Sequence, residues 1–344
     1  MRSNISASPV PQLDRNGPLH GRTSSSMSAV SLRNLLGFVR RLCACWVAGA
    51  IGLAFAAMPA PVLVAPGIYA LMGQPGEIAA ANLGRIVNVA FVVGPRGVIV
   101  VESGVSFRHG DEIIAAVERI TRKPIRLVVI THASQEVVFG AAAFQARGIP
   151  VWMHRESAAL MAERCGTCLQ TLRTELGERA MAGSRVAEPD HVVGKTQPLD
   201  VIGRRLVLIA PGGRDTTGAL ALWDETTGTL IAGSLVSIDR IPDLRDAGGK
   251  GWPEALAVLK ATRCIHLIPA LGRIGSCADI DALARYFAAL DGHVRTLLAE
   301  GVGLAELPER SDLPDFAAWD GYPTLHIQNA NRAYLRIERD SFKD

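Results

Sequence analysis

Short apolar runs alternate with stretches of helical periodicity from residue 67 to the end of the chain. Runs rich in β-branched residues predict strands at 68–71, 86–93, 97–102, 125–130, 150–153, 204–209, 219–223, 229–232 and 266–268. Apolar residues at helical spacing predict helices at 110–121, 140–147, 156–182, 253–261, 279–300 and 324–339. Turn residues at 94–97 and 224–228 lie between apolar runs and predict β-hairpins. Together these elements predict an α/β fold, with a mixed sheet and helices on its outer faces.

The N-terminal segment has a different composition. Residues 1–32 are rich in Ser, Pro, Asn and Gly with few large apolar side chains, which predicts a disordered extension. The adjacent pair Arg40 and Arg41 precedes an uncharged run of 17 residues, 42–58, and small residues follow. We interpret 33–60 as a cleaved signal peptide, a retained membrane anchor or, less simply, a buried core helix. Translation starts at either Met1 or Met27, and both leave the domain exported, in the periplasm or anchored facing it.

The charge distribution separates this leader from the rest of the chain. The chain carries a formal charge of +3, but residues 1–60 contain six arginines against one aspartate, so the other 284 residues carry a net −2. This balance excludes generic nucleic-acid binding by the folded part. The 49% hydrophobic and 20% charged content excludes a disordered polymer. We therefore expect residues 66–344 to form one folded domain, with C-terminal helices.

Candidate chemistry is concentrated in residues 127–144. An apolar strand runs into a polar turn and then a helix, which places His132, Ser134 and Glu136 at the carboxyl end of a strand. This stretch resembles the motif Thr-His-x-His-x-Asp-His-x-x-Gly of the metallo-β-lactamase fold. The resemblance spans most of residues 66–340. It implies an αββα four-layer sandwich of two mixed sheets flanked by helices.

Further segments carry the same resemblance. Residues 100–104 look like the family's strand ending in Asp-Thr/Ser-Gly, and three later turns look like its remaining motifs: 214–218, 232–235 and 268–272. The opening at 65–76 and the ending at 326–338 are most similar to the exported subset called quinoprotein relay system zinc metallohydrolases. That similarity implies oxidation linked to pyrroloquinoline quinone outside the cytoplasm, with an unidentified small molecule or periplasmic protein as partner.

The departures from the family motifs concern its zinc ligands. The resemblance implies zinc as cofactor, and His132 matches the first ligand. The other ligand positions are occupied by Ser134, Glu136, Val137, Asp215, Ser234 and Leu271. A catalytic zinc needs three strong protein ligands, so we expect zinc hydrolysis to be lost and the protein to be a binding or accessory component. Glycines retained at turns fit an inherited backbone path, because their role is conformational and independent of zinc: Gly140, Gly218, Gly233 and Gly272.

A hydrolase of a different kind remains open as a second hypothesis. One imidazole and two carboxylates, from His132, Glu136 and Asp215, form a set that suits iron or manganese. Ser134 would then act beside that metal, or the four side chains would act without one. In the simpler interpretation, His132 forms hydrogen bonds within the turn, and the carboxylates are solvated.

Cysteines supply a third hypothesis, of thiol redox chemistry. Cys165 and Cys168 form a Cys-x-x-Cys pair inside the predicted helix 156–182, without the strand that precedes such a pair in thioredoxin-like folds. They are buried thiols, a local disulfide, partners of Cys264 or Cys277, or part of a four-cysteine zinc site. The sequence leaves these alternatives open.

Overall fold

The computed structural model describes residues 58–212, 216, 218–245 and 251–342. Our predictions for residues 1–32 and for nearly all of 33–60 concern residues outside this range. Among the described residues, no helix is both long enough and apolar enough to span a bilayer.

The first sheet, sheet A, has seven strands in the order of the chain. Its strands are β1 (Val62–Ala65), β2 (Ile68–Leu71), β3 (Val89–Gly94), β4 (Gly97–Val101), β5 (Ile125–Val129), β6 (Val151–His154) and β7 (His191–Val193). Neighbours from β1 to β4 are antiparallel, and neighbours from β4 to β7 are parallel. Because β4, β5 and β6 are parallel, their carboxyl ends lie at one edge of the sheet.

The second sheet, sheet B, has five strands in the order β12-β11-β10-β9-β8. Its strands are β8 (Gln197–Pro198), β9 (Leu206–Ile209), β10 (Ala221–Asp224), β11 (Thr229–Ile238) and β12 (His266–Gly272). All neighbours are antiparallel except β11 and β12, which are parallel. Both predicted hairpins are confirmed, with Gly94 opposite Gly97 and Asp224 opposite Thr229.

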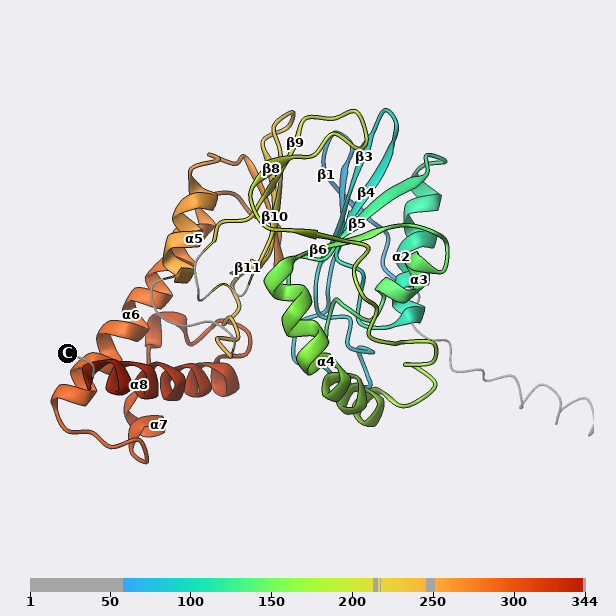
Figure 1. Ribbon diagram of the computed structural model, residues 1–344. Coiled ribbons are helices and arrows are strands. Elements are labelled where there is room, and N and C mark those ends of the chain that lie inside the picture. Colours follow the sequence, from blue (N-terminus) through green and yellow to red (C-terminus); the bar gives the residue numbers. More distant parts are fainter. Residues whose placement is uncertain (1–57, 213–215, 217, 246–250, 343–344) are drawn as a thin grey trace, which may run out of the picture. The chain divides into compact units, whose positions relative to one another are not determined.

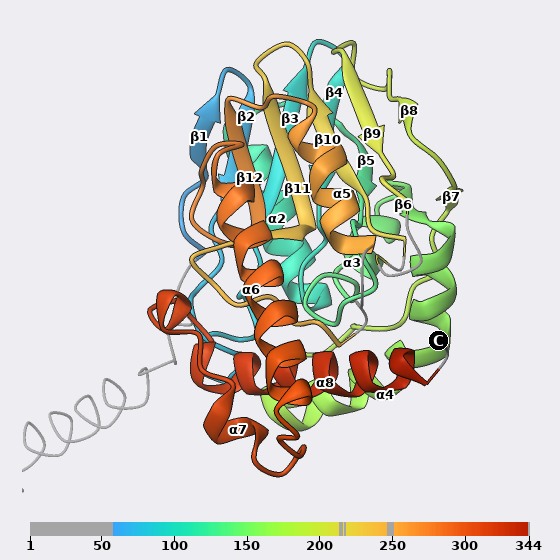
Figure 2. The same cartoon turned by 90° about the vertical axis from the view of Figure 1, so that its left-hand side faces the viewer.

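Alternate side chains along each strand face opposite sides of the sheet, and this alternation explains the four layers. Along β4, Ile99 and Val101 face the apolar core shared with sheet B, whereas Val98 and Val100 face the helices outside sheet A. Figures 1 and 2 show the two sheets face to face between helices. The helices outside sheet A are α2 (Phe107–Ile120), α3 (Ala141–Gln145) and α4 (Arg155–Leu176), and those outside sheet B are α5 (Gly251–Lys260) and α6 (Asp279–Ala299). The predicted αββα sandwich is therefore confirmed.

A C-terminal helical region packs against α6. It contains α7 (Leu307–Arg310), the short turns η1 (Pro314–Phe316) and η2 (Tyr322–His326), and α8 (Ile327–Ser341). Asn329 Nδ2 donates to the Tyr286 hydroxyl at 3.1 Å and to the Pro242 carbonyl at 2.7 Å, while the Leu244 amide donates to Asn329 Oδ1 at 3.2 Å. This buried amide side chain therefore holds residues 242–244, which border the cavity described below.

The differences from the predicted elements have local causes. The predicted helix 156–182 ends at Leu176, because Gly177 has a φ of 86°, a conformation that favours glycine and ends the helix. The short strands β1, β7 and β8 and the four-residue helix α7 were not predicted, since so few residues carry little periodicity.

The cysteine alternatives are corrected by the structure. Cys264 is joined to Cys277 by a disulfide that connects the turn before β12 with the residues leading into α6. Neither therefore pairs with Cys165 or Cys168, and the four-cysteine zinc site is wrong. Cys165 and Cys168 are both thiols within α4, so the local disulfide is wrong as well. Cys43 and Cys45 lie outside the described residues.

Removing the disulfide should destabilise the fold without changing it. The bond spans a sequence separation of 13 residues, and closing a loop of this size contributes about 3 kcal/mol in the chain-entropy account. We expect the double variant Cys264→Ala/Cys277→Ala to lose about that much free energy of unfolding in urea denaturation. Cys168→Ser, which removes a thiol and leaves the disulfide intact, is the control. Equal stability of the double variant and the native chain would contradict the disulfide.

Candidate functional site

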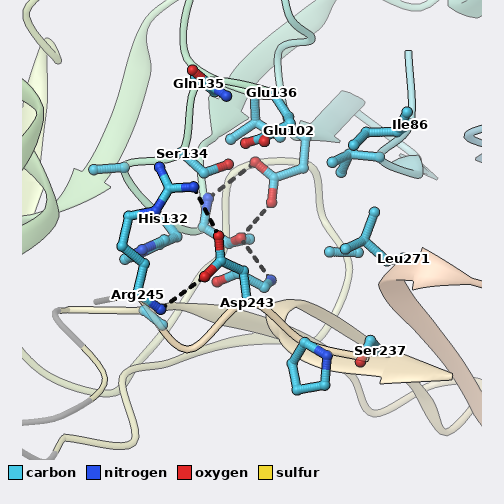
Figure 3. Close-up of a pocket in the computed structure, with 18 of the residues that line it drawn as sticks. Ile86, Glu102, His132, Ser134, Gln135, Glu136, Ser237, Asp243, Arg245 and Leu271 are labelled. Carbon is cyan, nitrogen blue, oxygen red and sulfur yellow. Dashed lines mark hydrogen bonds and ion pairs between the residues drawn. The ribbon is translucent and has the colours of Figure 1, made fainter. Parts of the chain in front are cut away.

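A cavity of about 420 Å³ lies where β4 and β5 of sheet A end. It is lined by residues that follow those strands, by residues of β11 and β12 in sheet B, and by one face of α4. Figure 3 shows the polar side chains that gather around it. Both sheets therefore contribute to one site, at the edge where the resemblance placed the family's chemistry.

Glu102 is the buried carboxylic acid of this cavity. It directly follows β4, is 2% exposed, and adopts a φ of 74°, which is unusual for a residue with a side chain. The Thr131 amide donates to Glu102 Oε2 at 3.2 Å, and the Thr131 hydroxyl donates to Oε1 (Figure 3). Burial raises the pKa of Glu102 to about 7, although the two hydrogen bonds from Thr131 oppose the rise. Glu102 can therefore hold or release a proton near neutral pH.

Thr131 also connects the two sheets. Its hydroxyl oxygen accepts from the Ser234 amide of β11 at 3.3 Å, and its carbonyl accepts from the Leu220 amide, just before β10, at 2.8 Å. The close approach requires glycine at 233, because a Cβ there would lie 2.3 Å from Thr131 Oγ1 and the residue has a φ of 53°. Hydrogen bonds and close backbone contacts between residues far apart in sequence therefore determine how the two sheets meet at the cavity.

The structure brings together most of the residues singled out in the sequence. His132, Ser134, Glu136 and Ser234 all line the cavity, and each is partly buried. Asp215 lies outside the described residues, so the set of His132, Glu136 and Asp215 is not tested. Among the described residues, no group of three or more His, Cys, Asp and Glu side chains is arranged to hold a metal ion.

Val137 and Leu271, which the sequence resemblance aligned with zinc ligands, line the same cavity with apolar side chains. Val137 is 3% exposed and belongs to the core under sheet A, and Leu271 packs against that core. The Val137 carbonyl accepts a hydrogen bond from the Ser103 hydroxyl, one residue beyond Glu102. Gly140 is required nearby, because a Cβ there would lie 1.9 Å from the Ser103 carbonyl oxygen.

The predicted role of the other retained glycines also holds. Gly218 and Gly272 have φ values of 75° and 88°, and a Cβ at either position would meet another atom within 2.5 Å. These turns therefore need glycine whatever side chains surround them.

Charged residues that were not among the predicted site residues border the cavity after β11. Asp243 accepts from the Arg245 backbone amide at 2.8 Å and from its guanidinium at 3.0 Å (Figure 3). Buried Arg240 donates from Nη1 to the Gly76 carbonyl at 2.9 Å and pairs with Asp320. Arg240, Asp243 and Arg245 follow the apolar strand β11 within seven residues. Their position just after a strand end is the feature of the sequence that could have identified them as site residues.

The helix α4 contributes both of its thiols to the cavity wall. Cys165 is 2% exposed and Cys168 is partly exposed, and Leu160 and Arg164 line the cavity from the same helix. The Cys-x-x-Cys pair noted in the sequence is therefore part of the same site as His132.

Comparison with known proteins identifies the class. The sequence profile of the Metallo-beta-lactamase superfamily matches residues 83–270, which is more than half of the chain. The chain belongs to the metallo-β-lactamase superfamily, and the resemblance noted in the sequence is confirmed at this level.

Solved structures agree with this assignment of the fold. A metallo-beta-lactamase from Pontibacter korlensis is 18% identical, with a TM-score of 0.53, and the match covers 65% of this chain and 96% of that one. The metallo-beta-lactamase FIM-1 from Pseudomonas aeruginosa, in its mono-zinc form, is also 18% identical with a TM-score of 0.53, over 67% and 96% of the two chains. No curated protein sequence matches the chain. At this identity the likeness shows the fold alone.

Buried Glu102 makes the free energy of unfolding depend on pH. The pKa of Glu102 is about 7 in the folded protein and near its ordinary value of 4.5 in the unfolded chain, so the unfolded chain releases this proton first as pH rises. The stability contributed by protonated Glu102 is complete below pH 4.5 and is lost as pH rises to about 7. The loss amounts to about 3 kcal/mol.

We expect Glu102→Gln to remove this loss. The measurement is the free energy of unfolding of both proteins in urea at several pH values, taken as a difference, because other groups also titrate. One of these is buried His109, whose pKa is lowered to about 3 by burial and by Arg85. The native chain should lose about 2–3 kcal/mol relative to the variant between pH 5 and pH 8. A pH-independent difference would show that Glu102 ionises normally.

Proposed function

We propose that this metallo-β-lactamase-fold protein is a non-catalytic binding or accessory protein whose cavity takes up a small molecule. The observation that supports this most directly is the lining of the cavity. The cavity persists at the strand ends, yet two positions that match zinc ligands of the family hold Val137 and Leu271. Apolar walls with a few converging polar groups are typical of small-molecule sites.

The residues present do not fit the family's zinc. Val137 and Leu271 have no donor atom, and Ser134 and Ser234 offer neutral hydroxyls where imidazole or carboxylate would be needed. His132 is the single imidazole among the described residues that line the cavity. We therefore derive no reaction step through zinc. The chain's own groups bind and orient a ligand instead: Glu102 with a hydrogen bond that depends on pH, and the Asp243 and Arg245 pair at the border.

Metal content tests this proposal. The purified protein should contain well below one equivalent of zinc, iron and manganese, since the described residues of the cavity do not bring together the three donors that a tightly held ion of this kind needs. Elemental analysis by plasma mass spectrometry is the measurement, after the protein has been exposed to each ion and desalted. One tightly held equivalent that is lost in His132→Ala, but kept in His191→Ala, would overturn the proposal. His191 is an exposed imidazole on β7 and serves as the matched control.

The second candidate, a hydrolase with another metal or none, is favoured by one observation. Glu102, with its raised pKa, shares the cavity with His132, Ser134 and Glu136, and acid and base groups with displaced pKa values are common at active sites. If the hydrolase uses a metal, the measurement of metal content distinguishes it from the non-catalytic binding protein. For chemistry without a metal, turnover of ester and amide substrates that is abolished in Glu102→Gln would favour the hydrolase.

We further propose that the protein is exported and acts beside quinoprotein oxidation. The basic flank and apolar run of residues 33–60 support export. The disulfide between Cys264 and Cys277 is of the kind that persists in an oxidising compartment. The quinoprotein context rests on the similarity at 65–76 and 326–338, and a pyrroloquinoline quinone-dependent partner would be a periplasmic one.

Export is tested with a fusion. Residues 1–60 joined to alkaline phosphatase should yield active enzyme outside the bacterial cytoplasm, because that reporter needs its own disulfides to fold. Leu53→Asp, which puts a charge into the apolar run, should leave the reporter inactive, whereas Ser8→Asp in the preceding extension should not change it. An inactive native fusion would contradict export. Mass determination of the released protein then separates a cleaved signal from a retained anchor.

A further inference from the structure

The two thiols of α4 occupy one face of the helix. Residues three apart in an α-helix lie one above the other, with Cβ atoms about 5–6 Å apart. Cys165 and Cys168 have this spacing, lie in the interior of the 22-residue helix, and both line the cavity. The cavity thus has a wall with two sulfur atoms, which the proposed ligand-binding role leaves unused.

The spacing of the two cysteines on the helix favours binding of a shared metal ion over formation of a disulfide. A disulfide needs Cβ atoms about 3.5–4.5 Å apart, which is less than the helix provides without unwinding. Two thiolates on a single metal ion span about twice the metal–sulfur distance of about 2.3 Å, or about 4.6 Å between sulfur atoms. The intact helix therefore suits a shared ion better than a sulfur–sulfur bond. The contrast with Cys264 and Cys277, which lie outside regular helix and are bonded, follows the same rule.

We propose that Cys165 and Cys168 bind a soft, thiophilic cation of the Cu(I) class at the cavity wall. Thiolate sulfur is the ligand that selects Cu(I). Binding replaces two S–H bonds with two sulfur–copper bonds and releases two protons. The cation arrives as Cu(I) and remains Cu(I), so no oxidant or reductant takes part.

The surroundings favour a two-coordinate cation over a four-coordinate one. Structural zinc takes four protein ligands, and no group of three or more His, Cys, Asp and Glu side chains able to hold a metal occurs in the described part of the chain. Two thiolates, in contrast, can be a complete ligand set for Cu(I). The pair therefore selects by coordination number as well as by softness.

The cation has a direct route to Cys168. Cys168 borders the cavity and is partly exposed, so an ion in the cavity reaches it directly. Its thiol donates to the Arg164 carbonyl at 3.4 Å, a weak contact to a helix carbonyl. A side chain at 166, between the two cysteines, would meet no atom within 4 Å, so that side of the turn is open.

The test is competition for Cu(I) between the protein and bathocuproine disulfonate under nitrogen. The full chain carries Cys43→Ser and Cys45→Ser throughout and is purified under nitrogen without a strong reductant, so that the Cys264–Cys277 disulfide stays closed. A thiol titration that counts two per chain, Cys165 and Cys168, precedes the addition of Cu(I). We expect one Cu(I) per chain and an ultraviolet thiolate-to-copper charge-transfer band. X-ray absorption of the complex should show two sulfur ligands.

Variants separate ligation from structure. Cys165→Ser and Cys168→Ser should each weaken Cu(I) binding by more than about 100-fold, beyond the 10- to 100-fold cost of disturbing only an outer-shell partner. Gly166→Ala keeps both thiols and the helix, so it should bind as the parent does. Thermal unfolding followed by circular dichroism checks that each variant is folded.

Three results would overturn the proposal. They are absence of Cu(I) binding by the parent with both thiols free, unchanged binding in the folded double variant Cys165→Ser/Cys168→Ser, and rapid closure of the pair to a disulfide in air with the helix intact. None of these bears on the zinc, iron and manganese content that tests the proposed function.

Discussion

The hydrogen bonds of Thr131 are the constraint on which the cavity depends. Its amide and hydroxyl hold the Glu102 carboxyl at the end of β4, its hydroxyl oxygen accepts from Ser234 of β11, and its carbonyl accepts from Leu220. One residue at the end of β5 therefore links both sheets at the edge where the site lies. Replacing Thr131 by valine would remove only its hydroxyl, which leaves Glu102 Oε1 and the Ser234 amide without that partner, at a cost of about 1–3 kcal/mol each.

This link also explains how the cavity can persist with altered side chains. Gly233 lets the β11 backbone approach Thr131, and Gly140 lets α3 approach the strand end at Ser103. Neither contact involves the side chain of Val137 or Leu271. The backbone at the strand ends therefore does not depend on which side chains occupy those two positions. Hydrogen bonds and close packing determine the fold, whereas the donor atoms present determine whether a metal binds.

Local sequence predicted most strands and helices, whereas the four layers with two sheets followed from the family resemblance, and the site was predicted only in part. Alternating apolar residues and two turns were enough to place most strands and both hairpins, since these depend on near neighbours. The polar turn after β5 likewise placed His132, Ser134 and Glu136 at the cavity. Contacts across the fold were not accessible: Glu102 meets Thr131 29 residues away, and Arg240 meets Asp320 80 residues away. The partner of Cys264 depended on tertiary proximity in the same manner.

The cavity combines two chemically different walls. The ends of sheet A supply oxygen donors and the imidazole of His132, which suit polar ligands and harder ions, whereas α4 supplies two sulfur atoms. The helix sets the Cβ separation of two residues three apart, which is longer than a disulfide needs and compatible with a shared soft cation. Binding of that cation replaces two protons by one monovalent ion, so the occupied site carries one more negative charge than the two thiols do. An anionic ligand in the same cavity would therefore be bound less well, and a cationic one better, when the α4 site is occupied.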